Sequence, residues 1–85
     1  MEQEQKFNAD YYSNKALGNF VRKQYQAAIV DYSKALYLIG DDASIYFSRA
    51  LAHLEVNQLT QARSDLRKAK ELGHPIPDEF INTCK

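Results

Sequence analysis

The sequence predicts an all-α fold, a helical solenoid of two antiparallel helix pairs followed by a C-terminal capping helix. Two observations carry this prediction: apolar residues recur at helical spacing along the chain, and the pattern repeats after 34 residues. Ala28 and Ala35 in the first half match Ala62 and Ala69 in the second half at that offset without a gap. Helical units of this length stack, so that neighbouring units bury one another's apolar faces.

The repeat divides the chain into four predicted parts. Residues 1–8 form an N-terminal extension, residues 9–42 the first repeat, residues 43–76 the second repeat and residues 77–85 the capping helix. With 85 residues in total, the chain has room for one small domain. We expect residues 1–8 either to fray or to extend the first helix.

The first repeat contains two predicted helices. Tyr12, Ala16 and Phe20 recur every four residues, and the segment from Tyr25 to Ile39 keeps a spacing of three and four residues. The break between the two helices falls at residues 22–24. Lys23 therefore occupies a position that favours a left-handed backbone, and we expect local strain there.

The second repeat follows the same design. Tyr46, Ala50 and Leu54 mark its first helix, and the apolar positions from Leu59 to Leu72 mark its second. The break falls at residues 56–58, where an asparagine suits the left-handed backbone of a helix C-terminus.

Glycines and prolines separate the units. Gly40 and Gly73 lie just past apolar helix ends, as C-cap glycines do. Asp42 and Ser44 are the residues that can cap the third helix. In the capping helix, Phe80 stands in the aromatic place of the first helices, and we expect it to pack on the second helix pair.

These features resemble the tetratricopeptide repeat family. Besides the period, the alternation of aromatic and small residues matches the family pattern at Tyr12, Ala16, Tyr25, Ala28, Tyr32 and Ala35. The resemblance covers the chain from about residue 9 to its end, although Gly40 and His74 replace the proline common near the end of a unit. It implies a right-handed superhelix whose concave face, lined by the first helix of each unit, binds a segment of a partner protein.

The resemblance also implies which residues face a bound peptide. A ladder of short polar side chains, able to donate and accept backbone hydrogen bonds, comprises Asn14, Ser48 and Asn82. An apolar strip beside it comprises Leu17, Val21, Phe47, Leu51 and Ile81. The alternative interpretation is that the strip packs inside the stack and the ladder is merely solvated.

One segment is similar to a more specific motif of the family. Residues 15–19 read Lys-Ala-Leu-Gly-Asn, the spelling that opens a two-carboxylate clamp for the acidic C-termini of Hsp70 or Hsp90 in some members. In the ungapped register, Ser13 and Leu17 hold the clamp positions instead, and Asp78 and Asn82 stand where cations are needed. An aspartate would repel a carboxylate, so we expect no clamp.

The composition of the chain argues against several other classes of protein. Eleven basic and eleven acidic residues give a formal net charge of zero, which argues against a general nucleic-acid binder. No apolar run approaches the length of a membrane span, and the polar N-terminus lacks a signal-peptide core. We therefore expect no membrane partner. The lone cysteine fits a reducing compartment, so we also expect a cytoplasmic chain.

No catalytic, metal or cofactor site is predicted. His53, His74 and Cys84 do not have the spacing of metal ligands, and the chain has no glycine-rich phosphate loop. The two histidines are interpreted as helix-surface or packing residues, and the cysteine as a small packed residue in the register of Ala16 and Ala50.

The sequence thus favours a non-catalytic protein–protein interaction module, an adaptor that binds a peptide segment. One alternative is a self-associating scaffold, because two units and a cap make a short stack that a homodimer would extend. Another is RNA contact through the basic face of the fourth helix, formed by Arg63, Arg67, Lys68 and Lys70. Two acidic residues, Asp65 and Glu71, dilute that face.

Overall fold

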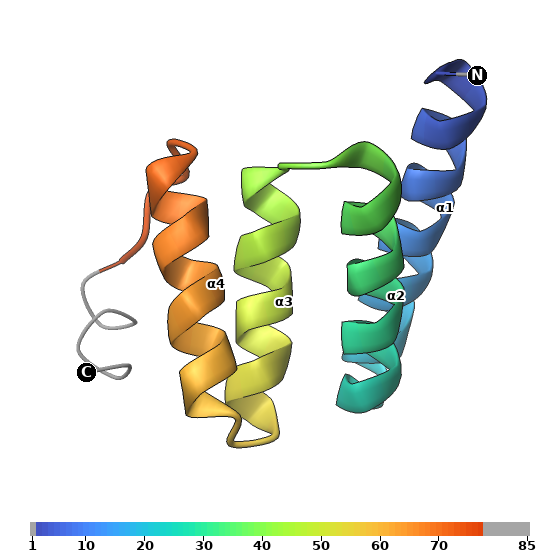
Figure 1. Cartoon of the computed structure of the whole chain (residues 1–85). Helices are drawn as coiled ribbons and strands as arrows, with labels where there is room; N and C mark the ends of the chain where they lie inside the picture. The colour runs from blue at the N-terminus through green and yellow to red at the C-terminus, as the bar shows by residue number, and fades with distance from the viewer. Residues whose placement is uncertain (1, 78–85) are drawn as a thin grey trace.

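Four α-helices form the protein in this computed structural model, which describes residues 2–77, with side chains from residue 8 onward. They are α1 (Glu2–Val21), α2 (Tyr25–Ile39), α3 (Ala43–Glu55) and α4 (Leu59–Glu71). Figure 1 shows the pairs α1–α2 and α3–α4 standing beside each other, with α2 and α3 adjacent. The described chain contains no strand, so the predicted all-α solenoid of two helix pairs is confirmed.

The turns inside each pair have the same backbone geometry. Lys23 has a φ of 65° and Asn57 a φ of 62°, so both adopt the left-handed conformation expected from the sequence. The amide of Gln24 donates to the carbonyl of Asn19 at 2.8 Å, and the amide of Gln58 donates to that of His53 at 2.8 Å. These bonds, five residues apart, satisfy carbonyls that a helix end would leave free.

The connection between the pairs is closed by a glycine and an aspartate. Gly40 has a φ of 86°, a conformation that a side chain disfavours. Asp42 caps α3, because its Oδ1 accepts a hydrogen bond of 3.1 Å from the amide of Ile45. Ser44, the other predicted cap, instead lies inside α3 and donates its hydroxyl to the Asp42 carboxylate at 2.7 Å.

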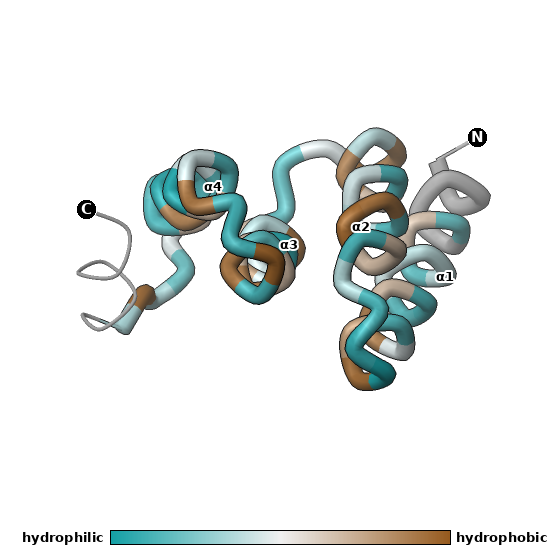
Figure 2. Tube along the Cα trace, turned by 90° about the horizontal axis from the view of Figure 1, so that it is seen from below, coloured by the Kyte–Doolittle hydropathy of each residue, from teal (hydrophilic) through white to brown (hydrophobic). Residues whose placement is uncertain are grey.

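Small residues allow the helices to approach closely. The six alanines of the repeat are all fully buried: Ala16, Ala28, Ala35, Ala50, Ala62 and Ala69. Larger side chains fill the space beside them, and Tyr32, Leu36 and Ile45 join the two pairs in one apolar cluster. Seen from below in Figure 2, the pairs lie side by side as successive layers of a stack.

The segments before and after the two repeats were predicted to be an extension and a capping helix. Residues 2–8, predicted as an extension, continue α1, which makes α1 the longest helix at 20 residues. After α4, Ile76 packs against a second apolar cluster formed by Ala50, Ala62 and Leu66. The predicted capping helix, including the docking of Phe80, lies outside the described residues.

Candidate functional site

Three of the predicted peptide-binding residues lie on α1 and are open to solvent. Leu17 is 55% exposed and Val21 is 73% exposed, although both are apolar. Asn14 is also exposed. Neither apolar side chain is part of the packed core, so α1 presents a pair of apolar contacts that the fold does not use.

The three predicted residues on α3 are half-buried. The Phe47 ring packs against the second apolar cluster and lies 4.7 Å from the His74 ring, centroid to centroid. Ser48 forms a hydrogen bond with the Tyr32 hydroxyl; burial raises the pKa of Tyr32, and this bond offsets part of the effect. Leu51 is half-buried as well.

The exposure of the predicted strip and ladder therefore differs between α1 and α3. Their α1 members are exposed, whereas Phe47 and Ser48 also take part in contacts that hold the fold together. The last members, Ile81 and Asn82, lie outside the described residues.

In the segment that resembles the clamp motif, the asparagine side chain already has hydrogen-bond partners inside the protein. Asn19 is only 8% exposed, and its Nδ2 donates to Oδ2 of Asp31 at 2.9 Å. Its Oδ1 lies 3.5 Å from a guanidinium nitrogen of Arg22. Lys15 is exposed. Because the amide of Asn19 is turned into the α1–α2 contact, it is not available to a carboxylate outside the chain.

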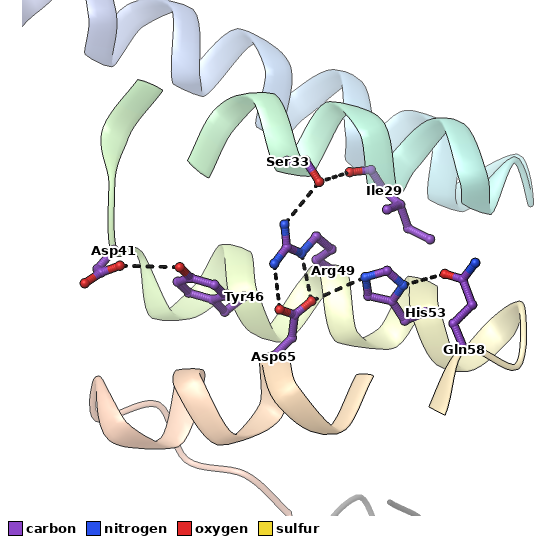
Figure 3. Close-up of polar contacts among 8 residues, drawn as sticks. All are labelled: Ile29, Ser33, Asp41, Tyr46, Arg49, His53, Gln58 and Asp65. Carbon is purple, nitrogen blue, oxygen red and sulfur yellow. Dashed lines mark hydrogen bonds and ion pairs between the residues drawn. The ribbon is translucent and has the colours of Figure 1, made fainter. Parts of the chain in front are cut away.

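The second pair holds a larger polar cluster at the equivalent position. Arg49 donates two hydrogen bonds to the Asp65 carboxylate, from Nε to Oδ2 and from Nη2 to Oδ1, each 2.7 Å long. His53 lies beside them, with Nε2 3.5 Å from Oδ2 of Asp65 and Nδ1 2.7 Å from Oε1 of Gln58. Figure 3 shows these side chains converging between α3 and α4.

Arg49 also reaches the first pair. Its Nη1 donates to the Ser33 hydroxyl at 3.1 Å, and this hydroxyl donates to the carbonyl of Ile29 at 2.7 Å (Figure 3). The hydrogen bonds with Asp65 raise the pKa of Arg49, although burial opposes this. The guanidinium therefore connects three helices, α2, α3 and α4.

This cluster was not predicted from the sequence. His53 is 7% exposed and Asp65 is 4% exposed, so neither belongs to a solvated surface. The signal was present in the repeat itself, because Asp31 matches Asp65 and Gln24 matches Gln58 at the 34-residue offset. A polar residue that recurs at one place in a helical repeat is a candidate for a buried contact between helices.

The described side chains offer structural rather than reactive chemistry. Within residues 8–77, no three His, Cys, Asp or Glu side chains come together in a way that would hold a metal ion. None of the described helices combines the length and the apolar character needed to cross a bilayer.

Known proteins similar to this chain include several chaperone organizers. The chain is 32% identical to the Hsp70-Hsp90 organizing protein 2 of Arabidopsis thaliana over 73 aligned residues. The alignment covers 84% of the chain and 13% of that protein. It is 33% identical over 61 residues to the Hsp70-Hsp90 organizing protein 1 of Glycine max, covering 72% and 11%. A third relative, the translocon at the outer membrane of chloroplasts 64 of Pisum sativum, is 43% identical over 47 residues, covering 55% and 8%. No family model matches the chain.

The fold and these similarities are consistent with one class of protein, a tetratricopeptide-type helical repeat domain. The particular relatives are much longer, and the chain corresponds to only 8–13% of their length. The similarity therefore concerns one small repeat segment of these proteins.

Proposed function

We propose that the chain is a non-catalytic interaction module that binds a segment of a partner protein along the first helices of its two repeats. The observation that carries this proposal is the exposure of Leu17 and Val21, two apolar side chains one helical turn apart on α1. Burial of such side chains supplies most of the affinity of a helical groove for a peptide. Leu51, the counterpart of Leu17 in the second repeat, is half-buried and extends the same row.

The charges beside this row favour a partner with basic residues. Asp10 on α1 and Glu55 on α3 are both exposed, at positions next to the proposed groove. With so short a groove, we expect roughly micromolar affinity. We further propose a cytoplasmic protein whose partners belong to chaperone assemblies, because the relatives include Hsp70-Hsp90 organizing proteins.

We do not expect the chain to bind a chaperone through the acidic C-terminal tail of that chaperone. A two-carboxylate clamp needs free donors, and Asn19 already donates to Asp31. A peptide ending in such a tail should therefore bind no better than its scrambled control. Micromolar, salt-sensitive binding that is lost in Lys15→Ala would contradict this expectation.

The alternative of head-to-tail self-association is opposed by charge. By the 34-residue offset, Lys15 takes the place of Arg49 on the side of α1 that would meet another unit. Arg67 and Lys70 take the places of Ser33 and Leu36 on the opposite end of the stack, and both are exposed. End-to-end contact would bring cations together, which costs free energy.

The alternative of RNA contact is weakened within the same helix. Lys68 forms an ion pair of 3.7 Å with Asp41, and the exposed Glu71 lies next to Lys70 at the end of α4. A chain with no net charge gains little from the phosphate backbone.

Two variants of equally exposed apolar residues test the proposed groove. A peptide selected from a random library for binding would be measured by fluorescence anisotropy against the chain, Leu17→Glu and Val30→Glu. Leu17 is 55% exposed and Val30 on α2 is 52% exposed, so both variants should fold. Leu17→Glu should weaken binding at least about tenfold and Val30→Glu should leave it unchanged. Equal binding to all three proteins would refute the groove.

A further inference from the structure

A cavity of about 200 Å³ opens where α1 meets the last turns of α2. Its lining residues are Tyr12 of α1 and Lys34, Tyr37 and Leu38 of α2. The Lys34 ammonium lies 5.3 Å from the centroid of the Tyr12 ring, and Tyr37 is 81% exposed. Among residues 8–77, no carboxylate forms an ion pair with Lys34. The cavity thus joins aromatic and apolar walls to a lysine that no carboxylate of residues 8–77 pairs with.

The second repeat shows how an equivalent site is filled. At the 34-residue offset, Tyr46 takes the place of Tyr12 and Lys68 that of Lys34. Asp41, from the connection between α2 and α3, reaches both: its Oδ1 lies 3.4 Å from the Tyr46 hydroxyl and its Oδ2 lies 3.7 Å from the Lys68 ammonium. Figure 3 shows the contact between Asp41 and Tyr46. One carboxylate can therefore contact both members of such a tyrosine–lysine pair.

The first repeat has no carboxylate at the position equivalent to Asp41. The position equivalent to Asp41 is Phe7, which belongs to α1 rather than to a loop. The position equivalent to Tyr37 is Glu71, so the second repeat carries a negative charge where the first has a neutral aromatic ring. The first repeat is thus the more receptive of the two toward an anion from outside.

We propose that the cavity between α1 and α2 binds an aspartate or glutamate side chain of an acidic segment of a partner protein. The carboxylate lies between the Tyr12 hydroxyl and the Lys34 ammonium, as Asp41 does in the second repeat. A neighbouring apolar side chain of the partner packs on Tyr37 and Leu38. This site is separate from the groove proposed above and does not depend on it.

A peptide taken from the chain itself is the sharpest probe. The capped peptide Ile-Gly-Asp-Asp-Ala-Ser copies residues 39–44, and its control carries asparagine at both aspartate positions. Chemical shifts of the isotope-labelled chain would be followed while each peptide is added. The acidic peptide should cause saturable shifts at the amides of Tyr12, Lys34 and Tyr37 with a dissociation constant of roughly 1 mM, because exposed ion pairs are weak. The control peptide should cause none.

Two lysine variants complete the experiment. Lys34→Met should weaken binding roughly fivefold, whereas Lys70→Met, which removes an exposed cation from α4, should leave it unchanged. Several outcomes would overturn the proposal: shifts centred on α4, equal responses to both peptides, wild-type binding by Lys34→Met, or no saturable shift at roughly 10 mM peptide.

Discussion

Replacing the buried aspartate of each repeat by asparagine measures the contribution of Arg49 to stability. Asp31 and Asp65 are both 4% exposed and occupy the same place in their repeats, so Asp31→Asn is a matched control for Asp65→Asn. They differ in their partners. Asp31 accepts a hydrogen bond from the neutral amide of Asn19, whereas Asp65 accepts two from the guanidinium of Arg49.

The expected losses follow from these partners. In Asp31→Asn, the new side-chain carbonyl can still accept from Asn19, so the loss should be about 0.5–1 kcal/mol. In Asp65→Asn, the new amide group points a donor at a cationic donor, and one charge-assisted bond is lost. Arg49 retains its bond to Ser33 and its side chain is 21% exposed, which limits the loss to about 2–3 kcal/mol.

Urea unfolding followed by far-UV circular dichroism would measure both losses. A difference of about 2 kcal/mol corresponds to roughly 10 °C in melting temperature for a domain of this size. Equal losses in the two variants would refute the reasoning, because the guanidinium would then add nothing to a buried carboxylate. A double-mutant cycle with Arg49→Met gives the pairwise free energy directly.

Three further changes have expected outcomes. Lys23→Gly should raise the free energy of unfolding by about 0.5–1 kcal/mol because glycine adopts a φ of 65° without strain; chemical denaturation would show it, and a loss would contradict it. Asp42→Ala should lower it by about 1 kcal/mol, because the Ile45 amide loses its cap, and Asp42→Asn should restore most of that loss in the same assay. Burial raises the pKa of Tyr32 above its ordinary value of 10.0, so the unfolded chain releases this proton first and stability is lost as pH rises above about 10. Tyr32→Phe should show a smaller loss between pH 9 and pH 11 in urea melts, and identical pH profiles would exclude Tyr32 as a source.

The sequence predicts the helices and their ends well because these depend on local signals. Apolar spacing places the four described helices, and the turns at Lys23 and Asn57 follow from the register of the repeat. The glycine at position 40 marks its helix end in the same way. These features need no knowledge of contacts between distant residues.

The polar contacts were harder to predict because they join residues on different helices. Arg49 and Asp65 are 16 residues apart, and nothing in the period of either helix indicates that their side chains meet. Of the two interpretations of His53, surface or packing, the structure supports packing, but nothing in the sequence indicated that it would lie buried beside that pair. The binding residues remain predictions, with Leu17 and Val21 exposed as a groove requires and Phe47 partly committed to packing.

The reach of Arg49 into the first helix pair has a consequence for folding. Each pair of a stacked repeat can in principle open by itself, and the tendency to do so depends on the interface between neighbours. Here a guanidinium of the second pair has one of its acceptors, Ser33, in the first pair. If α2 unravels, Arg49 keeps Asp65 but loses that acceptor, and the apolar contact between Leu36 and Ile45 is lost with it. These contacts couple the two pairs, and we expect amide protons in α4 to exchange with solvent together with those in α2, as one cooperative unit.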